Sequence, residues 1–368
     1  MLPLDTDTVP LKTPKPSTAG SRIQGAATVA QLGEFDELID ARSPAEYADD
    51  HIPGAISCPV LDDEQRARVG TLYQDSPFEA RKIGAVWVAR NVADHIERLF
   101  ADRPRGWRPL VYCWRGGQRS GAFSHILRQI GWDAQRLEGG YKAWRRHVID
   151  ELALLPRRFD YRVVGGATGS GKSRLLEALA AAGAQVLHLE ELASHKGSVL
   201  GPLPQTQQPS QRTFESRIHA CLSAFDQDRP VYVEAESRRI GSVQLPDALL
   251  TVIRAAPGLR IEATIAARVE FLLQDYDYFL ADPAWLIERL SQLAGLQSRE
   301  TVTHWIALAQ GGEFSELVEE LLERHYDPLY LRSQAKNFAG FSDAVRIGCD
   351  DLSPDGMARL AREILARA

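Results

Sequence analysis

The sequence VVGGATGSGKS, residues 163–173, joins an apolar segment to a helix-like segment through a loop rich in glycine and hydroxyl residues. Residues 166–173 fit the pattern G-x-x-x-x-G-K-[ST], in which backbone N–H groups curl around a phosphate. The N-terminal end of the following helix adds a partial positive charge. Because this loop works between a strand and a helix, the stretch indicates an α/β domain with a parallel sheet.

The side chains of this loop have separate predicted roles. Lys172 would reach the terminal phosphate oxygens, and the Ser173 hydroxyl would hold Mg²⁺ if that ion is bound. We expect no tightly bound cofactor and no metal held by the protein itself. The predicted phosphate-binding residues are Gly166, Thr168, Gly169, Ser170, Gly171, Lys172 and Ser173.

A nucleoside triphosphatase also needs an acidic residue at the end of a second strand, where it assists Mg²⁺. The segment VYVEAES, residues 231–237, offers Glu234 and Glu236 for this role. The same two carboxylates could instead pair with Arg238 and Arg239. The sequence favours neither interpretation.

Strand and helix patterns alternate on both sides of the phosphate-binding loop. Strands are predicted at 37–40, within 51–56, and at 110–112, 134–137, 161–164, 185–189, 231–234, 259–264 and 344–347. Helices are predicted from Pro44 and at 120–130, 141–155, 171–182 and 245–254, with mainly helical structure after Ala266 and a long mobile loop at 197–210. These patterns predict a disordered tail (1–21), a parallel-sheet α/β domain (22–150), a linker (151–160), a second α/β domain (161–270) and a mainly helical C-terminal region (271–368).

A second loop, VYCWRGGQRS at residues 111–120, follows a predicted strand of the first domain. Cys113 stands at the strand end, where backbone N–H groups, the helix N-terminus, Arg115 and Arg119 would stabilise a thiolate. The adjacent glycines allow close approach of the backbone. We therefore predict that Cys113, Arg115 and Arg119 are catalytic.

Three further segments lie in the same predicted domain as the cysteine loop: DARSPAEY at 40–47, HIPGA at 51–55 and EGGYKAW at 138–144. Together with that loop, they make residues 22–150 resemble a rhodanese, a sulfurtransferase module. This resemblance implies that Asp40, Arg42 and His51 organise the fold. The loop from Cys113 to Arg119 has seven positions, whereas ordinary sulfurtransferases have six. The related cell-cycle phosphatases also have the longer loop. The longer loop makes room for a larger anion or atom and argues against simple thiosulfate sulfurtransfer.

Composition and charge narrow the class of protein further. The four cysteines lie far apart without a C-x-x-C pair, which is typical of a reducing cytoplasm, and neither a membrane span nor a secretory signal is recognisable. The net charge is −6, yet residues 101–174 hold 15 Lys and Arg against 6 Asp and Glu, a local charge of +9. This asymmetry could direct a polyanion to one part of an acidic protein, although solvated surface arginines would give the same count.

Together, the motifs CWRGGQRS, EGGYKAWR, GGATGSGKS and VEAESRRIG resemble the bacterial tRNA 2-selenouridine synthase family from about Arg22 to at least Arg268. The resemblance implies that 2-thiouridine at the tRNA wobble position is S-geranylated from geranyl diphosphate, and that selenium from selenophosphate then replaces the geranylthio group. The implied partner is the tRNA anticodon stem-loop. The phosphate-binding loop would hold the prenyl diphosphate, and Cys113 would carry selenium as a selanyl-cysteine. Trp114 would either stack on a splayed base or pack internally.

The sequence does not locate a prenyl pocket. The region 245–330 contains enough Leu, Phe, Tyr and Trp to line one, although apolar residues at helical spacing usually form core. Two other functions stay open. One is an ATP-dependent sulfurtransferase that uses a Cys113 persulfide. The other is a non-enzymatic rhodanese-like module that binds nucleotide.

Overall fold

The computed structural model describes residues 25–198, 200–204 and 206–367, so the predicted tail (1–21) lies outside the described residues. Contacts within the chain define two compact units. The first extends to Glu151 and also includes Glu215–Ala224, and the second comprises Leu152–Phe214 and Phe225–Ala368. None of the helices among the described residues combines the length and the apolar character needed to cross a bilayer.

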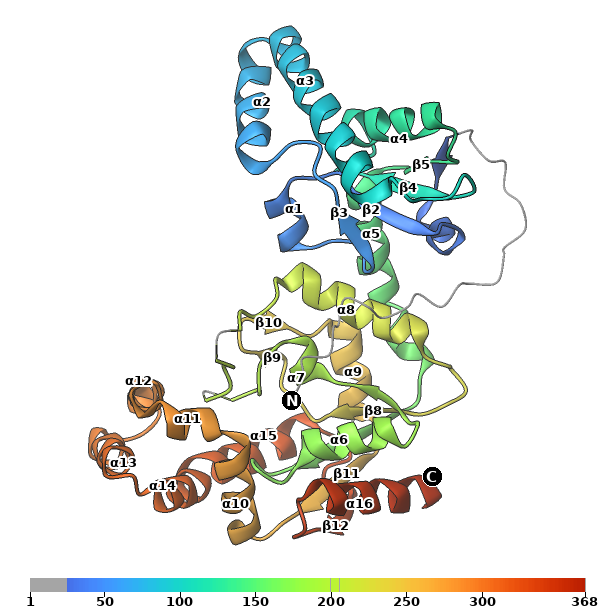
Figure 1. Cartoon of the computed structure of the whole chain (residues 1–368). Helices are drawn as coiled ribbons and strands as arrows, with labels where there is room; N and C mark the ends of the chain where they lie inside the picture. The colour runs from blue at the N-terminus through green and yellow to red at the C-terminus, as the bar shows by residue number, and fades with distance from the viewer. Residues whose placement is uncertain (1–24, 199, 205, 368) are drawn as a thin grey trace. The chain divides into compact units, whose positions relative to one another are not determined.

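The first unit contains a five-stranded parallel sheet with the strand order β1-β5-β4-β2-β3. Its strands are β1 (Ala26–Ala27), β2 (Glu37–Asp40), β3 (Ala55–Ser57), β4 (Pro109–Tyr112) and β5 (Gln135–Leu137) (Figure 1). The middle strand, β4, is buried along its whole length. The sheet confirms the predicted α/β class for this part of the chain.

Helices surround this sheet. They are the 3₁₀ helix η2 (Val29–Glu34), α1 (Pro44–Asp49), α2 (Asp63–Asp75), α3 (Pro77–His95), the π-helix η3 (Ile96–Phe100), α4 (Gln118–Ile130) and α5 (Gly140–Leu152). A capping box at Ser43 and Glu46 begins α1, as the Ser-Pro signal predicts. The sequence did not assign α2 and α3. In α2 no residue is buried, so an apolar face was not available as a signal.

The second unit also contains a five-stranded parallel sheet, ordered β12-β11-β6-β8-β7. Its strands are β6 (Tyr161–Gly166), β7 (Gln185–Leu187), β8 (Val231–Glu234), β11 (Gly258–Glu262) and β12 (Val345–Gly348). A separate antiparallel pair consists of β9 (Arg239–Ile240) and β10 (Val243–Gln244). The middle strand, β6, leads directly into the phosphate-binding loop.

The helical elements of this unit, with the shared helix α8, are η4 (Leu155–Arg158), α6 (Lys172–Ala181), α7 (Leu189–Leu192), α8 (Gln211–Ala224), α9 (Asp247–Ala255), α10 (Ile265–Asp275), α11 (Asp277–Ala281), α12 (Pro283–Ser291), η5 (Gln292–Gly295), α13 (Arg299–Gly311), α14 (Phe314–Leu321), η6 (Leu322–Tyr326), α15 (Asp327–Asn337) and α16 (Pro354–Arg367). Figure 1 shows α11 to α14 gathered in one group, in orange. This group has its own apolar core around Trp305, which confirms the predicted helical C-terminal region.

Several element boundaries differ from the predicted ones. Helix α4 begins at Gln118, two residues earlier than expected, because Gly117 already serves as its N-cap. The helix predicted to reach Leu155 ends at Leu152. The strand predicted to reach Leu189 ends at Leu187, since Leu189 begins α7. Among the described residues of 197–210 there is no helix, and Pro202 forms an isolated bridge with His195.

Candidate active sites

The cysteine loop, residues 113–117, connects β4 to α4 in the first unit. The N-terminal turn of α5 holds it in place: the Tyr141 N–H donates to the Cys113 carbonyl at 2.9 Å, and the Lys142 N–H donates to the Trp114 carbonyl at 3.0 Å. The conformation of the loop therefore depends on the segment EGGYKAW. In the sequence, only the resemblance to a rhodanese pointed to this segment.

Two glycines permit this close contact. Gly116 has a φ of 65° and Gly140 a φ of 60°, both in the left-handed region. A Cβ atom on Gly116 would collide with the Leu137 carbonyl, and one on Gly140 would collide with the Cys113 carbonyl and the Gly116 nitrogen. The backbone of the loop and that of the α5 N-terminus thus pack directly on each other.

The Cys113 thiol lies at the bottom of this loop. The residue is 3% exposed, and its Sγ atom lies 3.2 Å from the Ser120 hydroxyl in the first turn of α4. Cys58 differs in its surroundings: burial, with the charges of Glu37 and Asp40, raises the pKa of its thiol to about 12. Cys58 and Cys113 both belong to the apolar core, and the raised pKa makes Cys58 unsuited to nucleophilic chemistry.

The two predicted arginines have different environments. Arg115 is exposed, whereas the Arg119 guanidinium forms an ion pair with Glu46 at 2.6 Å. Burial alone would raise the pKa of Glu46, but the hydrogen bond and charge of Arg119 outweigh it and lower that pKa. A ligand anion at Arg119 would compete with Glu46. Glu46 was not predicted as a site residue from the sequence, although it stands three residues after the helix cap Ser43.

Asp40 and Arg42 form a buried ion pair at 2.6 Å, and the Arg42 guanidinium lies 4.0 Å from the centre of the Tyr141 ring. His51 stacks on Tyr47, and its Nδ1 atom lies 3.0 Å from the Tyr47 carbonyl. These contacts join the strand ends to the helix that supports the cysteine loop. They agree with the organising role that the resemblance implies for Asp40, Arg42 and His51.

Asp50 connects this network to the part of α8 that belongs to the first unit. Its carboxylate accepts hydrogen bonds from the Tyr141 hydroxyl at 2.7 Å and the Ser216 hydroxyl at 3.1 Å, and burial raises its pKa. Arg145 of α5 pairs with Glu215 of α8. The segment Glu215–Ala224 is therefore packed into the first unit, although it lies some sixty residues beyond Glu151 in the sequence.

In the second unit the phosphate loop, residues 166–173, runs from the end of β6 to the start of α6. Gly166, Gly169 and Gly171 all have positive φ values, of 156°, 79° and 78°. A Cβ atom on Gly169 would lie 2.8 Å from Leu272, and one on Gly171 would lie 2.8 Å from Met357. The glycines are therefore required both for the curl of the loop and for its packing.

Groups outside the motif position the loop. The Gly166 N–H donates to the Tyr330 hydroxyl at 2.7 Å, and Arg268 Nε donates to the Thr168 carbonyl at 2.8 Å. Arg268 is in turn held by two hydrogen bonds to Asp327, at 2.6 and 2.9 Å. No local sequence pattern connects these residues to a loop 100 to 164 positions away, so they were not predicted.

The polar side chains of the loop are arranged around its interior. Lys172 Nζ donates to the carbonyls of Gly166 at 2.9 Å and Ala167 at 3.3 Å, so the ammonium group lies across the loop. The Ser170 hydroxyl is buried and finds no hydrogen-bond partner among the described residues. An anion in the loop would supply acceptors for both groups.

Three carboxylates lie next to the phosphate loop. The Ser173 hydroxyl donates to Glu190 at 3.1 Å, and Glu234 accepts the Leu189 N–H at 2.8 Å. Burial, followed by the charge of Glu190, raises the pKa of Glu234 to about 8, and the same two causes raise the pKa of Glu236. Glu190 was missed in the sequence, although it closely follows β7, whose carboxyl end shares a sheet edge with β8.

The alternative pairing of these glutamates with Arg238 and Arg239 is not what the structure shows. Arg238 forms an ion pair with Asp247 at 2.6 Å, and Arg239 donates to the Gly241 carbonyl at 2.7 Å. The Ser173 hydroxyl and the Glu190 carboxylate are hard oxygen ligands of the kind that Mg²⁺ takes. These residues could therefore hold a divalent cation next to bound phosphates.

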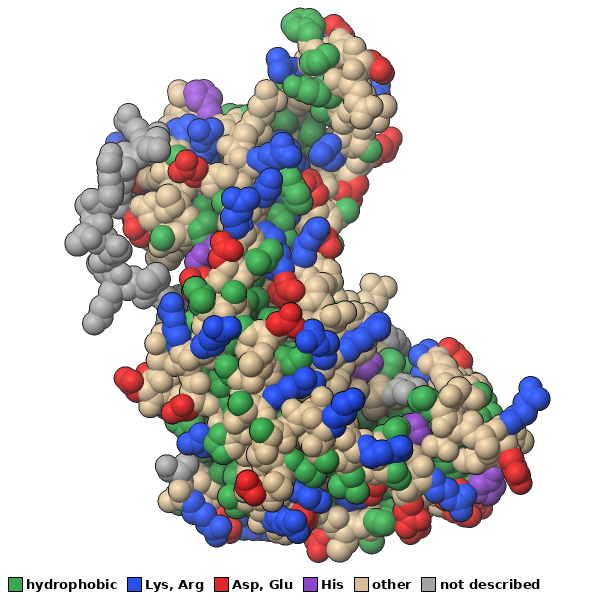
Figure 2. Space-filling view, turned by 180° about the vertical axis from the view of Figure 1, so that it is seen from behind, with side chains coloured by type: hydrophobic (Ala, Val, Ile, Leu, Met, Phe, Trp, Pro, Cys, Tyr) green, Lys and Arg blue, Asp and Glu red, His purple; other side chains and the backbone are tan. Residues whose placement is uncertain are grey.

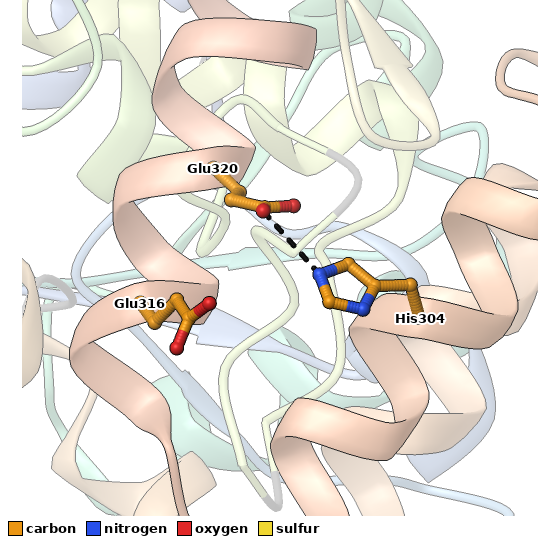
Figure 3. A group of neighbouring side chains, drawn as sticks. All are labelled: His304, Glu316 and Glu320. Carbon is orange, nitrogen blue, oxygen red and sulfur yellow. Dashed lines mark hydrogen bonds and ion pairs between the residues drawn. The ribbon is translucent and has the colours of Figure 1, made fainter.

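A second group of possible ligands lies on α13 and α14, where His304, Glu316 and Glu320 face one another (Figure 3). Glu320 already accepts the Trp305 indole N–H at 3.0 Å and pairs with Arg324 at 3.1 Å. His304 lies 3.3 Å from Glu320 and is largely exposed. These contacts are typical of surface polar pairs between neighbouring helices, and we assign the group no catalytic role.

Positive charge is distributed over the surface. Figure 2 shows many Lys and Arg side chains on the face turned toward the viewer, with Asp and Glu side chains among them. Several arginines of the basic segment 101–174 have acidic partners outside that segment, including Arg103 with Glu37 and Arg119 with Glu46. The local excess of +9 is thus partly compensated in the folded protein.

Both parts of the chain match domains of known protein families. Residues 25–147 match the rhodanese-like domain, and residues 159–298 match the tRNA 2-selenouridine synthase AAA domain. The tRNA 2-selenouridine synthase of Nitrosomonas europaea is 31% identical over 364 residues, covering 84% of this chain and 93% of that protein. That of Marinobacter nauticus is 34% identical over 326 residues, covering 80% and 87%. The chain belongs to the tRNA 2-selenouridine synthase family.

Proposed function

We propose that this protein converts 2-thiouridine in tRNA to 2-selenouridine in two steps, through an S-geranyl intermediate, with geranyl diphosphate and selenophosphate as substrates. The observation that carries the proposal is the pair of anion-binding loops in one chain. One presents the Cys113 thiol at a strand end, and the other presents Lys172 and Ser173 at a helix start. A reaction with two phosphorylated substrates needs two such loops.

In the first step the phosphate loop binds the diphosphate of the prenyl donor. The sulfur of 2-thiouridine attacks C1 of the geranyl group, the C–S bond forms, and the C1–O bond breaks as diphosphate leaves with the electron pair. The N3 proton of the uridine passes to solvent. The backbone N–H groups of the loop, Lys172 and the buried Ser170 hydroxyl stabilise the charge that develops on the leaving group.

Ser173 and Glu190 would hold Mg²⁺ if the reaction uses it. Their hydrogen-bonded side chains lie at the helix start, and both offer oxygen ligands. The ion would add positive charge beside the diphosphate. The chain's own contribution at this position is to orient the Ser173 hydroxyl toward the bound oxygens.

In the second step electron counting decides how selenium is carried. Selenium in selenophosphate is already at the selenide level, so an S–Se bond to Cys113 would require an oxidant or the release of phosphite. Direct attack needs neither: selenium bonds to C2 of the uridine, the C2–S bond breaks, geranylthiol leaves, and water cleaves the Se–P bond to give phosphate. We therefore replace the selanyl-cysteine with this direct displacement.

Cys113 acts in this scheme as the proton donor to the departing geranylthiolate. Its thiol lies against the Ser120 hydroxyl at the start of α4, where the helix N-terminus attracts the phosphate of the selenium donor. Arg115, which is exposed, would contact that phosphate. Arg119 would do so after exchanging its partner Glu46. The RNA partner is the anticodon stem-loop, and the protein would act in the cytoplasm.

The test is mass spectrometry of nucleosides from a 2-thiouridine anticodon stem-loop incubated with the purified protein. Geranyl diphosphate alone should give S-geranyl-2-thiouridine, and addition of selenophosphate should give 2-selenouridine. If the nucleoside stays unchanged while the protein hydrolyses ATP, the proposal fails in favour of an ATP-dependent sulfurtransferase.

A further inference from the structure

The second unit contains an apolar pocket beside the phosphate loop. It lies between α10, α11, α14 and η6 and encloses about 60 Å³, or about 580 Å³ when the part open to solvent is included. Its walls include Thr168, Leu272, Tyr276, Phe279, Val318 and Tyr326. We call this space the apolar pocket.

The phosphate loop forms one wall of the apolar pocket. Thr168 lines the pocket, and its carbonyl accepts a hydrogen bond from Arg268 of α10 at 2.8 Å. The next residue, Gly169, packs so closely on Leu272 that a Cβ atom there would lie 2.8 Å from the leucine side chain. The pocket therefore adjoins the loop that would hold the phosphates of a ligand.

Several side chains that line the apolar pocket are less buried than the side chains of a protein core. Leu273, Leu280, Phe314 and Val318 line the pocket and remain only half-buried. Leu272 and Leu317, deeper in the walls, are buried. Apolar side chains that face an open space next to a functional loop are typical of a site for an apolar ligand.

We propose that the apolar pocket binds the hydrocarbon chain of an allylic diphosphate whose diphosphate occupies the phosphate loop. The inference rests on the proposed function and names the part of the protein that recognises the prenyl group. A nucleoside would fit poorly, because most of the side chains that line the pocket are apolar and would leave many of its ring nitrogens and hydroxyls without hydrogen-bond partners. A branched hydrocarbon chain gains from the same surface.

Calorimetric binding of geranyl diphosphate, inorganic diphosphate and ATP to the full-length protein tests this inference without any turnover. Geranyl diphosphate should bind at least about tenfold more tightly than inorganic diphosphate, because each buried methylene adds to affinity. Val318→Phe, which fills the pocket, should reduce that advantage about tenfold and leave inorganic diphosphate binding within about twofold. The matched control is Val345→Phe, at an exposed position on β12.

Equal affinity of the unmodified protein for geranyl and inorganic diphosphate would overturn the inference, as would tighter binding of ATP than of geranyl diphosphate. An unchanged advantage in a folded Val318→Phe protein would do the same. If Val318→Phe does not fold, Phe314→Ala replaces it: the enlarged pocket should favour farnesyl over geranyl diphosphate by about tenfold relative to the unmodified protein. An unchanged preference there would also refute the inference.

The outcome separates this inference from the proposed function. Pocket-dependent binding of geranyl diphosphate without alkylation of 2-thiouridine would support the pocket and refute the first chemical step. If neither Val318→Phe nor Phe314→Ala alters alkylation by geranyl diphosphate, the first chemical step is supported. The hydrocarbon chain would then bind elsewhere in the protein.

Discussion

The cysteine loop of the first unit and the phosphate loop of the second both follow the middle strand of a five-stranded parallel sheet, β4 and β6, and both lead into a helix. In each case positive-φ glycines bring the backbone close to neighbouring segments. The two loops differ in the functional group that each carries. The first has a thiol at the strand end, and the second has an ammonium group that lies across the loop.

The charges around the loops also differ. The cysteine loop has one exposed arginine and one that is paired with Glu46. The phosphate loop lies next to Glu190, Glu234 and Glu236, and burial together with mutual repulsion favours protonation of the last two. In the proposed function, the strand–loop–helix backbone supplies anion affinity in both units, and the neighbouring side chains determine which reaction follows.

The sharpest test of this division is Cys113→Ser. Selenation should fall at least about a hundredfold, because serine is a much weaker proton donor, and geranylation should persist. Nucleoside mass spectrometry of both products measures the two steps, with Cys349→Ser as the control. Loss of geranylation as well would show that the loops do not act separately.

The converse change is Lys172→Ala. Geranyl transfer should fall by about 10²–10³-fold, because the leaving diphosphate loses its ammonium partner. RNA that is already S-geranylated should still be converted to selenouridine. The control is the exposed Lys336→Ala on α15. A matching loss of selenation from pre-geranylated RNA would contradict the assignment of one step to each loop.

Gly140→Ala tests the support of the cysteine loop. The new Cβ atom would collide with the Cys113 carbonyl, and φ at this position is 60°. We expect a loss of about 1–3 kcal/mol in the free energy of unfolding, measured by urea denaturation, together with reduced selenation. Gly106→Ala, where the new atom meets open space, should change stability by less than about 0.5 kcal/mol. Equal effects of the two substitutions would refute the proposed contact.

The pH dependence of stability tests whether Glu234, next to the phosphate loop, retains its proton in the folded protein. The pKa of Glu234 is about 8, whereas an unfolded glutamate ionises near pH 4.3. Between these values the folded protein retains a proton that the unfolded chain has lost, so the free energy of unfolding falls as pH rises and stays low above pH 8.

Glu234→Gln removes this titration and should make the fall between pH 5 and pH 8 smaller by about 1–3 kcal/mol, measured by chemical denaturation at each pH. The exposed Glu270→Gln on α10 serves as the control and should leave the slope unchanged. A slope in Glu234→Gln as steep as in the unmodified protein would show that other groups cause it.

Much of the fold could be predicted because its signals are local. The bounds of β2 and β8 agree with the predicted strands, since each is a short apolar run ended by an acidic residue. Helix α1 was recognised from its Ser-Pro start. Helix α2 was missed because none of its residues is buried. Helix α3 was missed because its buried face, with Ala80, Gly84 and Val92, contains small residues that give a weak apolar signal.

The motif residues of both sites were identified from the sequence, but the residues that position them were not. Tyr330 and Arg268 hold the phosphate loop from 100 to 164 positions away, and Asp50 meets Ser216 across 166 positions. Such contacts depend on how elements pack in three dimensions, and a single sequence contains no periodic pattern that reports them. The catalytic roles of the identified residues remain predictions.

Helix α8 limits how this protein can be divided into working parts. A fragment ending at Glu151 would lack Glu215–Ala224, and with it the Ser216 hydroxyl on Asp50, the Glu215 partner of Arg145 and the His219 ring against Trp144. Synthesis on the ribosome brings the segment Glu215–Ala224 out some sixty residues after Glu151, so the first unit completes its packing only when part of the second has emerged. A rhodanese-like half borrowed for engineering would therefore need α8 supplied as a separate peptide or joined by a new linker.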